Sequence, residues 1–155
     1  MIGDSSLSKR DFKRVTDPLS KFGPTFKLSK NKHLPLTIKG VDITKPIYHY
    51  EDKGSAQVKS SIILAALKTP GTTVIKAKKS RNHTEILCKH LGLPIKVKNY
   101  DKFDLIKINR AKKIRTLNYN IPSDISSSAF FIILTSLAKS SKLLINLRLG
   151  VLLRL

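Results

Sequence analysis

Groups that bind anions stand at three loops or helix starts along the chain. Arg10 follows a serine-rich segment, and Arg81 comes just before a polar helix start. Ser55 and Gln57 open an apolar helix, where free backbone N–H groups and the positive end of the helix dipole favour a negative ligand. Arginine adds a planar fork that matches phosphate and carboxylate oxygens. The recurrence of such groups predicts an oxyanion-binding site, although any one of them taken singly is better explained as an ordinary surface charge or, as for Ser55, a helix cap.

No catalytic set of residues stands out beside these groups. The chain has no nucleophile–base motif and no glycine-rich phosphate loop. His83 and His90 could share a helical face, but two histidines without a third ligand are weak as a metal site. The single cysteine, Cys88, excludes an internal disulfide, is expected to be buried packing, and fits a reducing, cytoplasmic compartment.

A strand–helix repeat is expected to position the anion-binding groups. Apolar spacing and turn residues between residues 44 and 110 predict the order β-α-β-α-β-β. The expected strands are 46–50, 72–77, 95–100 and 103–109, and the expected helices are 55–68 and 82–91. Asp101 and Asp104 flank the last hairpin and are expected to be solvated turn residues.

The same unit begins again after residue 110. Alternation predicts a strand at 114–120, a helix from 124 to 138 and a strand at 142–147, which gives a period of roughly 70 residues. The first 40 residues resemble the end of an earlier copy, with a loop at 5–10, a helix at 12–22 and a strand pair over 25–39. We therefore expect an α/β (α+β) fold and a chain that is a fragment of a longer protein.

The net charge of +20 raises the question of a nucleic-acid partner. The 23 lysines are scattered along the whole chain and only 7 arginines accompany them. A nucleic-acid surface usually concentrates its charge and adds arginine or exposed aromatic rings. We therefore expect no nucleic acid among the partners, and small anionic ligands drawn by the overall field. No apolar run reaches the roughly 18 residues that cross a membrane, so no membrane is expected either.

Four blocks in order along the chain resemble one enzyme family. They are Gly3-Asp4-Ser5-Ser6-Leu7-Ser8-Lys9-Arg10, Ser55-Ala56-Gln57-Val58-Lys59-Ser60, Ser80-Arg81-Asn82-His83-Thr84-Glu85 and Asp124-Ile125-Ser126-Ser127-Ser128-Ala129-Phe130-Phe131. These blocks resemble 5-enolpyruvylshikimate-3-phosphate (EPSP) synthase, the 3-phosphoshikimate 1-carboxyvinyltransferase. The resemblance implies two similar lobes, each of three β-α-β-α-β-β units in an inside-out α/β barrel, incomplete here. Residues 1–120 would be the remainder of the first lobe (1–40 the end of one unit, 41–112 a full unit), and 121–155 the truncated start of the second.

The resemblance also implies roles for matching residues. Arg10 would bind the phosphate of phosphoenolpyruvate, Ser55 and Ala56 would contact shikimate 3-phosphate, Gln57 would lie between both substrates, and Arg81 would sit beside the shikimate ligand. The family's reaction transfers the enolpyruvyl group to the shikimate 5-hydroxyl and releases phosphate, in the pathway to chorismate and the aromatic amino acids. The resemblance implies no cofactor, no metal, a monomeric parent enzyme and a cytoplasmic location. The acid–base groups of the second lobe are absent, so this chain alone is expected to be inactive.

Two departures and two alternatives accompany this resemblance. Asp11-Phe12 stands where the family usually has Pro-Met, which puts a carboxylate beside Arg10. After Ile145 the sequence leaves the family pattern, as though the reading frame were lost. The alternatives are a fragment of the related transferase that acts on UDP-N-acetylglucosamine, and a small basic nucleic-acid-binding module. The presence of both the block from Ser55 to Ser60 and the block from Gly3 to Arg10 favours the shikimate enzyme over the UDP-N-acetylglucosamine enzyme.

Overall fold

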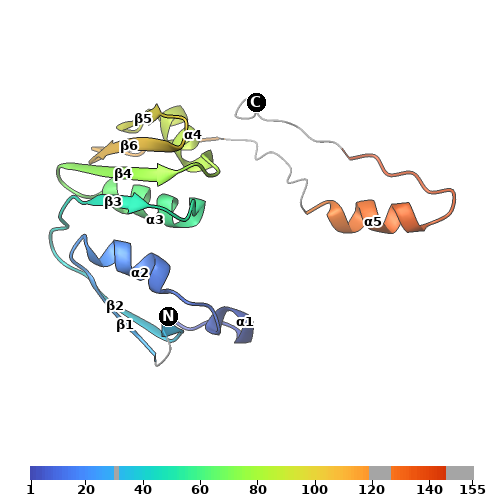
Figure 1. Cartoon of the computed structure of the whole chain (residues 1–155), viewed down its shortest axis with the longest axis horizontal. Coiled ribbons are helices and arrows are strands. Elements are labelled where there is room, and N and C mark those ends of the chain that lie inside the picture. Colours follow the sequence, from blue (N-terminus) through green and yellow to red (C-terminus); the bar gives the residue numbers. More distant parts are fainter. Residues whose placement is uncertain (30–31, 119–126, 146–155) are drawn as a thin grey trace. The chain divides into compact units, whose positions relative to one another are not determined.

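The chain is divided into two compact units in its structure. The computed structural model describes residues 1–29, 32–118 and 127–145 (Figure 1). The first unit runs from Met1 to Arg115 and the second from Thr116 to Leu155. Every residue predicted to bind an anion lies in the first unit. The assignment of the units to lobes stays a prediction.

The first unit begins with two helices and a two-stranded sheet. The elements are α1 (Ser5–Ser8), α2 (Lys13–Ser20), β1 (Thr25–Leu28) and β2 (Leu36–Lys39). β1 and β2 pair antiparallel, with Thr25 opposite Lys39. The predicted helix at 12–22 and the strand pair are confirmed. The predicted loop at 5–10 is wrong, because the Asp4 carboxylate accepts a hydrogen bond from the Leu7 N–H (2.7 Å) and caps the short helix α1.

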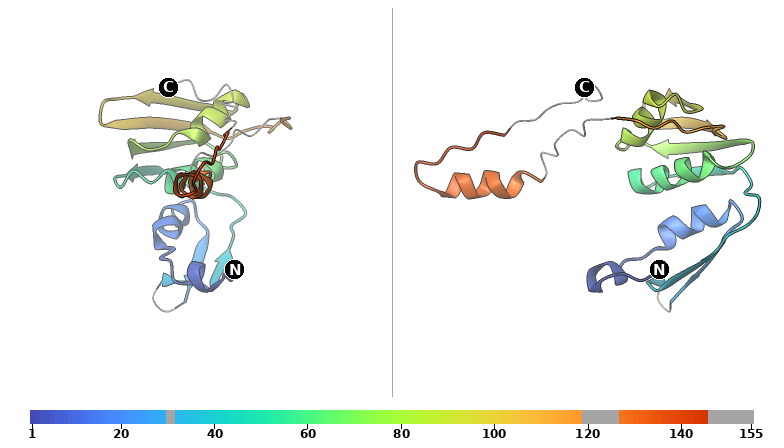
Figure 2. Two further views of the ribbon diagram at one scale, coloured as in Figure 1. Left: turned by 90° about the vertical axis from the view of Figure 1, so that its right-hand side faces the viewer. Right: turned by 180° about the vertical axis from the view of Figure 1, so that it is seen from behind.

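The rest of the first unit is a four-stranded sheet with two helices. Its elements are β3 (Tyr48–Glu51), α3 (Ala56–Ala66), β4 (Thr72–Lys78), α4 (His83–His90), β5 (Ile95–Asn99) and β6 (Phe103–Asn109). The strands lie in the order β3-β4-β6-β5, with β3 parallel to β4 and the other neighbours antiparallel. The ribbon views show α3 and α4 lying alongside this sheet (Figures 1 and 2). The β-α-β-α-β-β order expected from the sequence is confirmed.

One hydrophobic core holds both helices against the same face of the sheet. The strands alternate, so β4 buries Ile75 while β6 buries Ile106 and Ile108. These isoleucines form one cluster with Ile62 of α3 and Cys88 of α4. Burying each such aliphatic side chain contributes about 1.5–3 kcal/mol. The burial of Cys88 agrees with its expected packing role, and burial raises the pKa of its thiol, with Glu85 adding to the effect.

The second unit has one described helix, α5 (Ala129–Leu137). It falls within the helix predicted at 124–138, of which residues 124–126 lie outside the described chain. The strands predicted at 114–120 and 142–147 are not found over residues 114–118 and 142–145, and their remaining residues lie outside the described part. Alternation alone does not make a strand, because the backbone N–H and C=O groups also need a partner strand. No side chain of α5 is buried.

Candidate functional site: two loops at one sheet edge

The loop between β3 and α3 is fixed by two acceptor side chains. Ser55 is the N-cap of α3, and its hydroxyl oxygen accepts a hydrogen bond from the Val58 N–H at 3.3 Å. The buried carboxylate of Glu51 accepts from the N–H groups of Lys53 (3.1 Å) and Ser55 (3.2 Å). The cap was predicted from the sequence. The role of Glu51 is not predicted from the sequence. Nothing in its local sequence distinguishes a carboxylate that accepts backbone hydrogen bonds from an ordinary charged residue at a strand end.

The parallel pairing of β3 and β4 brings this loop beside the loop that carries Arg81. Glu51 lies opposite Ala77, so both strands end at the same sheet edge, and loops at the carboxyl ends of neighbouring parallel strands commonly form ligand sites. Gly54 has φ +67°, and a Cβ atom there would lie 3.1 Å from the carbonyl oxygen of Lys79. The backbones of the two loops therefore come close together at Gly54 and Lys79, and Lys79 stands two residues before Arg81.

Two side-chain contacts hold the starts of α3 and α4 together. Lys59 Nζ lies 2.6 Å from Glu85 Oε1, with the Lys59 side chain fully buried, and neither charged group has another polar partner in the described chain. The hydroxyls of Ser60 and Thr84 form a hydrogen bond of 2.6 Å. The helix that begins at Ala56 and the helix that follows Arg81 are thereby fixed relative to each other.

Arg14 links α2 to the same helix start. Its guanidinium nitrogen Nη2 donates to Gln57 Oε1 at 3.0 Å, and both side chains are exposed. Arg14 was not among the predicted site residues. The only feature of the sequence that could have pointed to Arg14 as a site residue is its position four residues after Arg10.

Arg10 lies at the end of the short segment before α2. Its carbonyl oxygen is 3.0 Å from His33 Nδ1. The Asp11 carboxylate accepts a hydrogen bond from the Lys13 N–H at 2.7 Å, so this acid has the start of α2 as a partner. Within the described residues no contact joins the exposed Arg10 side chain to Gln57 or Arg81. The structure therefore brings Ser55, Ala56, Gln57 and the Arg81 loop together, without tying Arg10 to them.

Ser80 is a further candidate site residue, which its place in the sequence did not single out. It immediately precedes Arg81, and its hydroxyl oxygen is buried without a hydrogen-bond partner in the described chain. Buried hydroxyls are normally paired. Ser80 is therefore a candidate donor to a ligand held beside Arg81.

His49 adds an electrostatic feature behind the loop. Its Nε2 is 3.7 Å from the Glu51 carboxylate. Burial lowers the pKa of His49, and Lys21 lowers it further, while Glu51 and Asp52 act in the opposite direction. The lowered pKa favours the neutral imidazole of His49 beside Glu51.

Asp104 differs from its predicted role. It is buried, and its carboxylate is 2.9 Å from Lys79 Nζ. The prediction of a solvated turn residue is wrong for Asp104, because β6 begins at Phe103 and turns this side chain to the core face. The contact ties β6 to the residue whose carbonyl faces Gly54.

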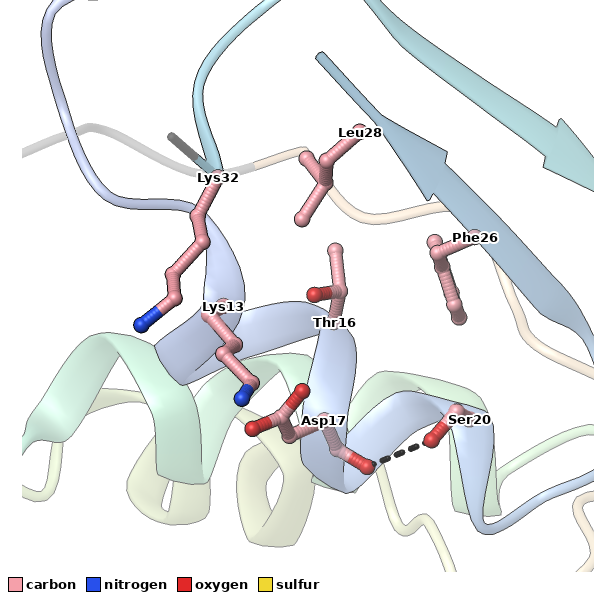
Figure 3. A pocket seen from close by; sticks show the side chains of 7 residues that line it. All are labelled: Lys13, Thr16, Asp17, Ser20, Phe26, Leu28 and Lys32. Carbon is pink, nitrogen blue, oxygen red and sulfur yellow. Dashed lines mark hydrogen bonds between the residues drawn. The ribbon is translucent and has the colours of Figure 1, made fainter. Parts of the chain in front are cut away.

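A hollow elsewhere in the first unit is separate from these loops. It measures about 290 Å³ and lies between one face of α2 and the strand β1 (Figure 3). Its lining residues are Lys13, Thr16, Asp17, Ser20, Phe26, Leu28 and Lys32. None of the predicted anion-binding residues lines it, so it is not the predicted site.

Neither a metal cluster nor a membrane span is found where the structure is described. Within residues 1–29, 32–118 and 127–145, no group of three His, Cys, Asp or Glu side chains is placed to hold a metal ion. Over the same residues, no helix has the length and apolar character needed to cross a bilayer.

Comparison with known proteins decides the family. The family model described as EPSP synthase (3-phosphoshikimate 1-carboxyvinyltransferase) matches residues 1–149. The chain belongs to the EPSP synthase family. This confirms the resemblance read from the four sequence blocks, and the family is one of enzymes.

Individual EPSP synthases agree over most of the chain. A 3-phosphoshikimate 1-carboxyvinyltransferase of Caldicellulosiruptor bescii is 46% identical over 148 residues, which cover 94% of this chain and 34% of that protein. One of Novosphingobium aromaticivorans is 38% identical over 147 residues, again 94% of this chain and 33% of that protein. The EPSP synthase structure from Acinetobacter baumannii superposes with a TM-score of 0.72 at 36% identity, covering 87% of this chain and 30% of that one. The chain thus spans about one third of the length of the relatives it matches.

Proposed function

We propose that this chain is part of the substrate-binding wall of a 3-phosphoshikimate 1-carboxyvinyltransferase, which transfers the enolpyruvyl group of phosphoenolpyruvate to the 5-hydroxyl of shikimate 3-phosphate. The observation that carries the proposal is the meeting of the Ser55–Gln57 helix start and the Arg81 loop at one sheet edge. The parent enzyme is expected to be monomeric, cytoplasmic and free of cofactors, and this chain alone is expected to be inactive.

The start of α3 supplies donors for the phosphate of shikimate 3-phosphate. The backbone N–H groups of Ala56 and Gln57 belong to the first turn, whose donors have no partner within the helix. The Ser55 hydroxyl uses a lone pair for the Val58 N–H and keeps its own hydrogen to donate. Arg81, with Ser80 beside it, would add charge-assisted hydrogen bonds from the neighbouring loop.

Gln57 would donate to the substrates through its amide nitrogen. Its oxygen accepts from Arg14, which leaves the NH₂ group as the free end of the side chain. In the proposed reaction the shikimate 5-hydroxyl loses its proton and its oxygen bonds to the phosphate-bearing carbon of phosphoenolpyruvate, while the double bond opens and the methylene carbon takes a proton. Loss of phosphate and of a proton then restores the double bond. The residues of this chain would orient the two substrates for that addition, with Arg10 on the phosphate of phosphoenolpyruvate.

A chimera tests the proposal. The matching segment of the Caldicellulosiruptor bescii relative is replaced by residues 1–148 of this chain, and carboxyvinyl transfer is assayed. We expect the chimera to turn over shikimate 3-phosphate and phosphoenolpyruvate. Gln57→Ala and Arg81→Ala should each lower kcat/KM about tenfold or more, the effect of losing one hydrogen bond to a charged group.

The matched control is Arg110→Ala. Arg110 is also exposed but follows β6, which runs antiparallel to β4 and ends at the opposite sheet edge. It should leave kcat/KM unchanged within about twofold. A chimera that uses UDP-N-acetylglucosamine instead, or one in which the Arg81 and Arg110 variants are equally impaired, would contradict the proposal. Turnover by the 155-residue chain alone would contradict its expected inactivity.

A further inference from the structure

The four-stranded sheet has a second face, on the side away from α3 and α4, which no described helix of the first unit covers. Alternation along β4, β6 and β5 turns five lysines to this outer sheet face: Lys76, Lys78, Lys96, Lys98 and Lys107. The acidic residues of the four-stranded sheet, Glu51 of β3 and Asp104 of β6, belong to the buried face. The outer sheet face thus carries positive charge without an acidic side chain at any outward strand position.

Aromatic rings lie among these lysines. Tyr48 and Tyr50 of β3 are 61% and 56% exposed. Tyr100, just after β5, stacks on Phe103 of β6 with ring centroids 4.6 Å apart and an interplanar angle of 22°. Tyr48 and Tyr50 pair with Val74 and Lys76, so three of the four tyrosines of the chain lie on this one face.

Two of the five lysines place their ammonium groups over aromatic rings. Lys76 Nζ lies 4.5 Å from the Phe103 ring centroid and 5.5 Å from that of Tyr50, and Lys98 Nζ lies 5.2 Å from that of Tyr100. Over β5 and β6 the face is hollowed by about 350 Å³, lined by Lys96, Lys98, Tyr100, Leu105 and Lys107 together with Val97. The ammonium groups are thus held within reach of both the rings and any anion that settles on the face.

We propose that the outer sheet face binds a single-stranded nucleic acid. A track of lysines neutralises phosphates, and neighbouring aromatic rings stack on unpaired bases, which is how sheet surfaces hold single strands. A base that settles on a ring displaces an ammonium group, which then pairs with the adjacent phosphate. A duplex offers no free base faces and fits the rings less well.

This proposal reverses an expectation based on the sequence. The lysines are scattered along the chain, and that scatter argued against a nucleic-acid partner. Pairing of β4, β6 and β5 gathers five of them on one surface with the rings, which linear spacing does not reveal. The proposal does not rest on the proposed transferase function, because the core separates the outer sheet face from α3.

Fluorescence anisotropy tests the proposal with the full chain and labelled 15-nucleotide oligo(U) and oligo(dT). The double variant Tyr50→Ser with Tyr100→Ser should raise the Kd for the oligonucleotides at least about fivefold. This is the lower end of the range, about 1 kcal/mol, expected for the loss of a single stacked base. The same variant should leave binding of inorganic polyphosphate unchanged, since polyphosphate has no bases. The comparison of oligo(U) with oligo(dT) separates RNA from DNA as the preferred strand.

Matched lysine variants separate the face from the overall charge. Lys76→Gln, Lys96→Gln and Lys107→Gln together should weaken oligonucleotide binding at least tenfold and reduce its salt dependence. Lys39→Gln, Lys68→Gln and Lys89→Gln remove three exposed lysines elsewhere and should change it less than threefold. Equal losses of affinity in both triple variants would mean that net charge alone drives the binding, and would overturn the proposal. Tighter binding to phosphatidylglycerol vesicles or to duplex DNA than to the single strands would also overturn it.

Cross-linking of the unaltered chain guards against variants that fail to fold. Oligo(U) carrying 4-thiouridine should cross-link to peptides containing Tyr48, Tyr50, Tyr100 or Phe103. Cross-links confined to other peptides would overturn the proposal.

Discussion

At the residue scale, the buried pair of Lys59 and Glu85 decides how firmly the candidate site is held. The two charges lie 2.6 Å apart, almost without solvent contact. Removing one partner leaves an uncompensated buried charge, so Lys59→Met or Glu85→Gln should lower the free energy of unfolding by about 3–5 kcal/mol. Replacing both, as Lys59→Met with Glu85→Leu, should recover most of that loss, because an apolar pair needs no desolvation of charge. Urea denaturation with a constant m-value measures these differences.

The pair of Lys79 and Asp104 provides the comparison at the same scale. Lys79 is 46% exposed, so water can replace it beside Asp104. Lys79→Met should therefore lower the free energy of unfolding by about 1 kcal/mol or less. A loss as large as that of Lys59→Met would show that burial does not set the difference between the two pairs.

At the element scale, the close approach of two loops depends on Gly54. Gly54 and Gly92 both have positive φ (+67° and +64°), so alanine is strained at either. A Cβ at Gly54 would also meet the Lys79 carbonyl, whereas one at Gly92 would meet nothing within 4 Å. Gly92→Ala should destabilise the chain by about 1 kcal/mol, and Gly54→Ala by more. In the chimera only Gly54→Ala should raise KM for shikimate 3-phosphate, and equal KM values in both variants would contradict the loop contact.

Most of the helices and strands of the first unit could be predicted from the sequence, whereas the contacts between them could not. Alternation and turn residues were sufficient for β3 to β6 with their two helices, because each of these segments buries one face in a shared core. They failed at residues 114–118, where the alternation has no partner strand in the described chain. The Ser55 cap follows from local spacing, whereas Arg14–Gln57 and Lys59–Glu85 join residues 43 and 26 positions apart. Contacts at such separations depend on how elements pack, which no single-sequence pattern encodes.

At the scale of the whole molecule, the two units differ in how much they bury. The core cluster draws all its members from the first unit, between Phe22 and Ile108. No described residue of the second unit is buried, and α5 exposes large apolar side chains, among them Phe130 (76%) and Leu137 (82%). The first unit therefore has a core of its own, whereas the described residues of the second unit form no buried core.

This contrast predicts different behaviour for the full chain and for residues 1–115. Exposed apolar surface promotes association, so the full chain should form concentration-dependent oligomers in sedimentation velocity, and residues 1–115 should sediment as a monomer. The buried Cys88 thiol, whose pKa burial raises, should resist Ellman's reagent in both until urea unfolds them. Rapid modification of Cys88 in residues 1–115 would mean that the first unit needs the rest of the chain to fold. Equal association of both proteins would place the association surface on the first unit instead of α5.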